Sequence, residues 1–323
     1  IVTDNSIVSP DGTVTGAILA DSGLGGTSGV QVYENVTVDV SSTYTYSVFA
    51  KKKDLNFIAL RTNAFTTPSD GQSYFDLNLG TTLGVATGHT SKIENYGNGW
   101  YRCSVTFTTD AVDTIGTIIT RLSQDGTTST VDLDNTSNVY IWGFQFEKNS
   151  YATSYIKNAG TALGVTRVAD TATGSGNSTV INSTEGTLYA EISALANDLS
   201  LREIAISDGT NNNRIELRFA DLNSEIDLVV RSIDSSVQAN FGTTSYDVTN
   251  FNKVAVRYKL NDVSLWVNGV KINTDTSAIM PINLSELAFD SGAGANDFYG
   301  KTKSVQVYTT ALSDAELTSL TTI

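Results

Sequence analysis

Apolar and polar residues alternate one by one in many short segments of this 323-residue chain. Such alternation places apolar side chains on one face of a β-strand and polar side chains on the other. Turn residues such as Gly, Asn and Asp separate the segments. The pattern therefore predicts an all-β protein made of antiparallel β-sandwiches. In the first half, the predicted strands are residues 44–51, 55–61, 73–79, 100–107, 115–122 and 139–147.

A second series of alternating segments begins at residue 186, after a stretch of small polar residues without a burial pattern. We therefore predict two tandem sandwiches, a jelly roll at residues 1–157 and a second sandwich at 186–323. A Gly/Ser/Thr-rich connector at residues 158–185 joins them. Among the segments of the second half, the clearest strands are residues 213–219, 225–231, 253–260, 263–267 and 270–272, the last two joined by an Asn-Gly turn.

Only the tail of the chain has a helical pattern. Ser313 and Glu316 have the spacing of a capping box, in which each side chain bonds to the backbone of the other residue. Leu312 and Leu317 stand where a hydrophobic staple requires apolar residues. The tail therefore predicts one short C-terminal helix that closes the second sandwich.

The residue inventory excludes several kinds of chemistry. One His (His89) and one Cys (Cys103) cannot form a His/Cys zinc site, an iron–sulfur cluster or an internal disulfide. We expect His89, in a loop-like stretch, at the surface, and Cys103 in the core. Acidic residues outnumber basic ones 34 to 20, giving a formal net charge of −14. This charge disfavours general nucleic-acid binding and attraction to anionic membranes.

The ends and the hydropathy of the chain indicate its context. No apolar run approaches the length of a membrane span, and the N-terminus lacks the pattern of a signal peptide. The chain begins at Ile1 rather than at Met, so we expect it to be a processed or excised part of a longer protein.

The first half resembles a known type of module. The segment Tyr140-Ile-Trp-Gly-Phe-Gln-Phe-Glu147, followed by residues 151–156 and 166–170, is similar to a recurrent segment of bacteriophage tail and fibre proteins. Those segments close a jelly roll like that of carbohydrate-binding modules. Residues 44–51 and Gly97-Asn-Gly-Trp-Tyr-Arg-Cys103 resemble earlier strands of the same module. The resemblance implies an extracellular, virion-surface protein that binds a polysaccharide or cell-surface glycan, often within a trimeric fibre.

The second half resembles laminin-G-like, concanavalin-A-like lectin domains in residues 186–191, 265–269 and 299–317. That fold occurs both in lectins and in enzymes that cleave polysaccharides, so it does not decide the function. We predict a non-catalytic, glycan-binding adhesion module. A polysaccharide lyase or glycoside hydrolase and a purely structural virion protein are the alternatives.

Two short strings resemble parts of enzyme motifs. Arg214-Ile-Glu-Leu-Arg218 is similar to the arginine-rich strand of jelly-roll alginate lyases, which also need a histidine, and the second half contains none. Glu225-Ile-Asp227 is similar to the start of a signature of retaining glycoside hydrolases. In that signature a second catalytic Glu is required where Val230 stands. We therefore expect no catalysis in this segment.

Glycan binding needs an aromatic face beside groups that form hydrogen bonds. Trp100 and Arg102 share one face of a predicted strand and are candidates for such a site. The alternative is that Trp100 only covers the edge of the core. In the second half, one tryptophan falls out of phase with its apolar neighbours and joins the polar faces of three predicted strands. If these strands adjoin, they form a glycan platform; otherwise the face is solvated and held by weak ion pairs. The platform candidates are Arg214, Glu216, Arg218, Asp227, Arg257 and Trp266.

Clustered acidic residues suggest one further ligand. Asp110 with Asp113, and Asp132 with Asp134, offer carboxylate oxygens of the kind that Ca²⁺ prefers. The alternative is ordinary turn chemistry, because Asp side chains commonly bond to the backbone of turns. We predict that no cofactor is required and keep a structural Ca²⁺ as a hypothesis without assigned ligands.

Overall fold

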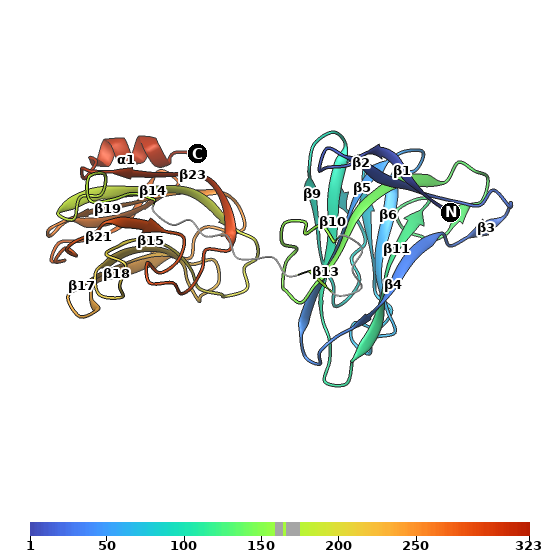
Figure 1. The fold of residues 1–323 in the computed structure, drawn as a ribbon, viewed down its shortest axis with the longest axis horizontal. Coiled ribbons are helices and arrows are strands. Elements are labelled where there is room, and N and C mark those ends of the chain that lie inside the picture. Colours follow the sequence, from blue (N-terminus) through green and yellow to red (C-terminus); the bar gives the residue numbers. More distant parts are fainter. Residues whose placement is uncertain (159–163, 166–174) are drawn as a thin grey trace. The chain divides into compact units, whose positions relative to one another are not determined.

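The computed structural model describes residues 1–158, 164–165 and 175–323 (Figure 1). The chain divides into two compact units, Ile1–Arg167 and Val168–Ile323. Each unit contains two main antiparallel sheets with a hydrophobic core between them, so the predicted all-β fold of two sandwiches is confirmed. Part of the predicted connector at 158–185 lies outside the described residues. In its described part, Ile181 is buried in the core of the second unit.

The first sheet of unit 1 has the strand order β1-β2-β13-β5-β10-β9. The alternation in β10 places Cys103 and Val105 in the core, as predicted, and turns Trp100 and Arg102 to the opposite face. The strands of this sheet are β1 (Val2–Val8), β2 (Val14–Ala20), β5 (Thr43–Lys52), β9 (Thr90–Asn95), β10 (Trp100–Thr108) and β13 (Asn138–Glu147).

The second sheet of unit 1 has the order β4-β11-β6-β7-β8. Ile58 and Leu60 on β6 pack into the core, whereas Arg61 faces away from it. The strands of this sheet are β4 (Gln31–Thr37), β6 (Phe57–Asn63), β7 (Gln72–Asp76), β8 (Thr81–Thr82) and β11 (Ile115–Ser123). The short strands β3 (Thr27–Ser28) and β12 (Val131–Asp132) form a separate pair.

His89 is buried in unit 1, so the predicted surface position is wrong. Its two ring nitrogens lie 2.8 Å from Thr62 Oγ1 and 2.9 Å from Ser73 Oγ. Burial lowers the pKa of His89 to about 4, because an imidazolium ion loses its hydration there. The side chain is therefore neutral at pH 7 and serves as a hydrogen-bonded part of the interior.

Unit 2 is built in the same way from two five-stranded sheets. The first has the order β21-β20-β19-β14-β23, and the second has the order β18-β17-β16-β15-β22. The strands of the first are β14 (Glu185–Ala194), β19 (Asn252–Lys259), β20 (Val263–Val267), β21 (Val270–Asp275) and β23 (Gly300–Tyr308). The strands of the second are β15 (Arg202–Ser207), β16 (Arg214–Phe219), β17 (Ile226–Ser232), β18 (Ser236–Thr243) and β22 (Glu286–Ala288).

The predicted C-terminal helix is present as α1 (Asp314–Thr321). Its capping box is complete, since the Ser313 hydroxyl accepts from the Glu316 amide and the Glu316 carboxylate accepts from the Ser313 amide. Figure 1 shows α1 lying along the outer side of the sheet that contains β14 and β19. The helix buries Leu317 against this sheet, so the outer face is covered here and not exposed to solvent.

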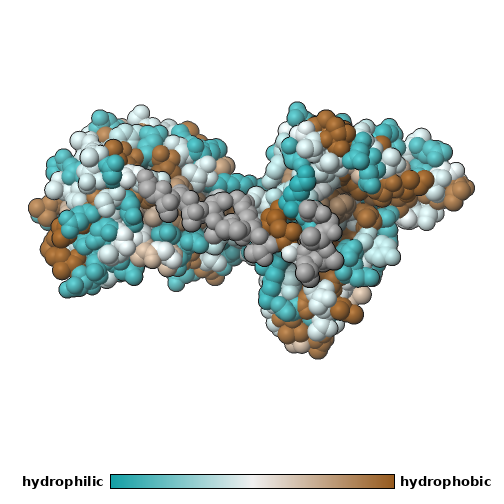
Figure 2. All heavy atoms as spheres, in the orientation of Figure 1, coloured by the Kyte–Doolittle hydropathy of each residue, from teal (hydrophilic) through white to brown (hydrophobic). Residues whose placement is uncertain are grey.

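The surfaces of the two units are mixed in character. Figure 2 shows hydrophilic and hydrophobic residues interspersed over the visible face of each unit, as is usual for folded proteins. Within the described residues, no helix combines the length and the apolar character that a membrane crossing requires.

Candidate functional site

The first predicted glycan-binding pair, Trp100 and Arg102, is not exposed. Each side chain is only 2% exposed. Trp100 packs with Phe49 and Trp142, and its indole nitrogen donates to the Val8 carbonyl at 3.1 Å. The Arg102 guanidinium donates to Ser47 Oγ at 2.9 Å and to a backbone carbonyl, and it stacks over Phe49. The prediction of a binding surface here is wrong, because neighbouring segments cover this face of the sheet.

Trp266 and Arg257 lie on the sheet face that α1 covers. Trp266 does point away from the core, as its phase predicted, but it is only 4% exposed and packs against Leu317. Arg257 pairs with Asp262 at 2.8 Å and with Asp314 at 2.7 Å, and the second contact ties the first turn of α1 to β19. These two residues hold the helix and offer no open aromatic face.

The four remaining platform candidates lie on the other sheet of unit 2. Arg214, Glu216 and Arg218 alternate along β16, and Asp227 stands opposite Arg218 on β17. This sheet is not the one that carries Trp266 and Arg257. The predicted single platform of charges around a tryptophan is therefore wrong, because its members occupy two different sheets.

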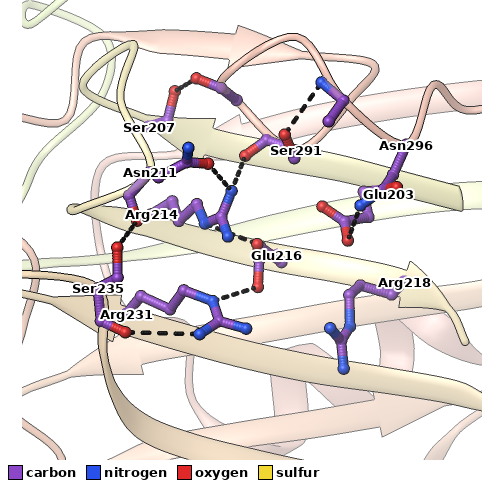
Figure 3. A network of polar contacts seen from close by, with 12 residues as sticks. Glu203, Ser207, Asn211, Arg214, Glu216, Arg218, Arg231, Ser235, Ser291 and Asn296 are labelled. Atoms are coloured by element: carbon purple, nitrogen blue, oxygen red, sulfur yellow. Dashed lines mark hydrogen bonds and ion pairs between the residues drawn. The ribbon is translucent and has the colours of Figure 1, made fainter. Parts of the chain in front are cut away.

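Figure 3 shows Arg214 and Glu216 in a network of polar contacts, with Arg218 beside it. Arg218 in turn forms an ion pair with Asp227 at 2.5 Å. The Glu216 carboxylate is fully buried and forms ion pairs with Arg214 at 2.7 Å and with Arg231 at 3.3 Å. Arg214 also donates to the Ser291 carbonyl at 3.0 Å, which ties the sheet to the segment of residues 289–299. The charges are neutralised within the protein, and few of their hydrogen-bonding atoms are left for a ligand.

Glu203, on β15, is the most perturbed carboxyl of this network. It is 2% exposed and accepts a hydrogen bond from the Asn296 amide at 3.1 Å, while its Oε2 atom is buried without a hydrogen-bond partner among the described residues. Burial, followed by the charge of Glu216, raises the pKa of Glu203 to about 7. A carboxyl of this kind exchanges a proton near neutral pH, but the covered position keeps a polysaccharide away from it.

An open groove lies instead on the outer face of the second sheet of unit 1. Its volume is about 380 Å³, and its floor is formed by β4, β11 and β6. Tyr33 on β4 is 59% exposed and stands opposite Ile119, which stands opposite Arg61. The residues that line the groove are Gln31, Tyr33, Arg61, Asn63, Thr117, Ile119 and Arg121.

Polar side chains surround the exposed tyrosine of this groove. Thr117 donates to the Asn35 side chain at 2.9 Å, and Arg61 donates to Asn63 at 3.2 Å. Amide, hydroxyl and guanidinium groups are the partners that sugar hydroxyls use, and a tyrosine ring offers a flat apolar face. We call this surface the Tyr33 groove.

The two arginines of the Tyr33 groove are near neighbours. Arg121 stands opposite Ala59 and Arg61 stands opposite Ile119, so the two arginines are diagonal neighbours on β11 and β6. Burial and then the charge of Arg61 lower the pKa of Arg121. Arg61 bonds to Asp70 at 2.6 Å, whereas Arg121 bonds to the uncharged side chains of Gln31 and Ser129.

The Tyr33 groove was not predicted from the sequence, although the sequence contains a signal for it. Residues 55–61 and 115–122 are correctly predicted as strands, and their outward positions include Arg61 and Arg121. The signal that was overlooked is the alternation of Gln31, Tyr33 and Asn35, which places three hydrogen-bonding side chains on one face of β4.

The acidic side chains considered for Ca²⁺ accept hydrogen bonds from the protein itself, some in turns and some across distant segments. Asp113 accepts from the Thr66 amide at 2.7 Å, and Asp110 accepts from the Val112 amide at 2.8 Å. Asp134 accepts from the Thr136 amide at 2.9 Å. In the described part of the chain, no group of three or more His, Cys, Asp or Glu side chains is arranged to hold a metal ion.

Comparisons with known proteins concern the fold. No curated protein matches the sequence. Among solved structures, the CBM40 of a Ruminococcus gnavus IT-sialidase, bound to α2,3-sialyllactose, is 20% identical, covers 45% of this chain and 86% of its own, and has a TM-score of 0.40. Sheep galectin-11 is 10% identical over 40% of this chain and 92% of its own, with a TM-score of 0.31. Domains LG4-5 of the mouse laminin α1 chain are 11% identical over 85% and 84%, with a TM-score of 0.27.

The second half of the chain matches a protein-family model. Its predicted resemblance to concanavalin-A-like lectins agrees with a match to a protein family that covers just under half of the sequence. Residues 170–318 match the family described as the Concanavalin A-like lectin/glucanases superfamily, so unit 2 is similar to the lectin-like sandwiches of that superfamily.

Proposed function

We propose that this protein is a non-catalytic, glycan-binding adhesion module, and that the Tyr33 groove of unit 1 is its binding site. The observation that carries the proposal is the exposed Tyr33 ring beside a row of amide, hydroxyl and guanidinium groups in one open groove. An aromatic face and planar hydrogen-bonding groups in one open groove suit an extended sugar chain.

The phage resemblance of residues 140–147 supports a place on a virion surface or another extracellular fibre. Single grooves of this kind bind weakly, because they bury only part of a sugar chain. Several copies of the module in one fibre, such as a trimer, would multiply that weak affinity. Unit 2 is similar to lectin-like sandwiches, which supports a carbohydrate-related role for the protein as a whole.

A lyase or hydrolase remains the enzymatic alternative. Its strongest candidates are Glu203 and Glu216, both of which are covered by surrounding protein. Catalysis requires that a carboxyl reach the glycosidic oxygen or the ring of the substrate. This covered arrangement supports binding without cleavage.

The proposal is tested by a glycan array with the full chain, followed by titration of the best-bound glycan. Replacing the exposed tyrosine, Tyr33→Ala, should lower the affinity about fivefold or more, since aromatic residues dominate such contacts. Tyr299→Ala is the matched control, because Tyr299 is 54% exposed but lies in unit 2. Equal binding by the wild type and Tyr33→Ala, or the release of new reducing ends from the glycan, would overturn the proposal.

A further inference from the structure

We infer that the Tyr33 groove selects acidic glycans, with Arg121 as the anchor for a carboxylate or sulfate group on the sugar. This inference rests on the proposed function and deepens it, because it names the chemical class of the ligand. The argument starts from the positions and partners of the two arginines in the groove.

The charged groups on the groove floor have one sign. Arg61 and Arg121 are the two charged residues that line it, whereas the chain as a whole carries a formal charge of −14. The backbone positions of diagonal neighbours on adjacent strands lie about 7–8 Å apart. The charge of Arg61 therefore acts on Arg121 and disfavours its positive charge. A bound anion would relieve this repulsion, and a neutral sugar would not.

Arg121 is the arginine with room for an anion. It donates to Gln31 Oε1 at 2.5 Å and to Ser129 Oγ at 3.3 Å, and within the described residues it forms no ion pair with a carboxylate. Its partly buried position removes some of the water that would otherwise compensate its charge. A guanidinium group presents several planar donors, so oxygen atoms of a carboxylate or sulfate can replace the weak contact to Ser129.

Arg61 already has an anionic partner within the protein, which would compete with an acidic glycan for this arginine. Asp70, on the turn between β6 and β7, accepts from Arg61 Nε at 2.6 Å, and the Asp70 side chain is 58% exposed. This carboxylate occupies Arg61 as a sugar carboxylate would. Its negative charge also repels an incoming acidic glycan. Asp70 therefore lowers the affinity of the groove, and its removal should raise it.

The test uses a glycan array that contains acidic and neutral members, with the full chain as the probe. The best-bound acidic glycan is then titrated beside its carboxyl-reduced or desulfated form. The wild type should bind the acidic form about tenfold or more tightly. Arg121→Gln should remove most of this difference, and Arg121→Lys should keep only part of it, because lysine retains the charge without the planar donors.

A gain of affinity supplies a test that misfolding cannot imitate. Asp70→Asn should strengthen binding of the acidic glycan severalfold and leave binding of its neutral form unchanged. Asparagine suits the positive φ of 41° at this position.

The possible outcomes separate this inference from the proposed function. Equal affinity for acidic and neutral forms, or an unchanged preference in Arg121→Gln, overturns the acidic selection, while sensitivity to Tyr33→Ala would still support glycan binding in the groove. If no array member is bound, the proposed function fails and the inference fails with it. Tighter binding of the acidic form that depends on both Arg121 and Asp70 supports the inference.

Discussion

Arg218 on β16 and Asp227 on β17 face each other directly and form two hydrogen-bonded contacts, of 2.9 Å and 2.5 Å. Their side chains are only 14% and 6% exposed. The pair is therefore a nearly buried, two-point ion pair, whose main consequence is for stability. Its removal should not affect glycan recognition.

Replacing one partner, as in Asp227→Asn, should lower the free energy of unfolding of unit 2 by about 3 kcal/mol, because the other charge is left buried without its partner. Arg218→Gln should have a similar effect. The double variant should lose less than the sum of the two changes, because the contact is already lost. Urea denaturation measures the stabilities, and glycan titration should show unchanged affinity. A loss of glycan affinity at full stability would instead assign the pair to a binding site.

The same pair shows what the sequence could predict in unit 2. Alternation along residues 213–219 correctly places Arg218 on the face opposite to Leu217, because the direction of side chains in a strand is a local property. Alternation cannot show that Trp266 belongs to a different sheet, because strand order depends on pairing between distant segments.

Coverage of a sheet face is likewise not visible in a strand pattern. Arg102 and Trp266 point away from the cores, as their phases predict, yet other segments bury both. The site in unit 1 escaped prediction for the opposite reason. Tyr33 lies in a strand with few strongly apolar residues, so its sequence alone does not predict a binding site. The site becomes visible only when the structure places Arg61 and Arg121 beside it.

Glu203 should make unit 2 less stable as the pH rises from about 4.5 to about 7. In this window the unfolded chain releases the proton of Glu203, whereas the folded chain keeps it, because its pKa is raised to about 7. The expected loss is on the order of 2 kcal/mol. Hydrogen exchange of peptides from β15, corrected for the intrinsic rate, measures it. Glu203→Gln should remove this dependence, and an unchanged dependence in that variant would contradict the assignment.

His89 should give unit 1 the opposite response. Its pKa is lowered to about 4 in the folded state, so between about 6.5 and 4 only the unfolded chain takes up a proton. The stability of unit 1 should therefore fall as the pH is lowered through this range, by on the order of 2 kcal/mol. Hydrogen exchange of peptides from β6 and β7 reports it in the full chain. The acid sensitivity should disappear in His89→Gln; if it persists there, another group is responsible.

We expect the Leu317 side chain to anchor α1 on the sheet and to shield Trp266 from solvent. Leu317→Ala removes a fully buried side chain and should lower the stability of this contact by about 2–3 kcal/mol. The released helix should expose Trp266, seen as a red shift of tryptophan fluorescence that is absent when Trp266→Phe is added. Ser319→Ala, an exposed change on the same helix, is the control and should leave the fluorescence unchanged. An identical spectrum for Leu317→Ala would show that the helix does not depend on this anchor.

The location of glycan binding can be read directly from methyl NMR spectra of the full chain during titration with the glycan that the array identifies. Ile119 lies on the floor of the Tyr33 groove, and Val229 lies beside Glu216 on the charged face of unit 2. Our account predicts that the Ile119 methyl signals shift with glycan concentration while the Val229 signals stay in place. Shifts of Val229 with an unperturbed Ile119 would contradict it.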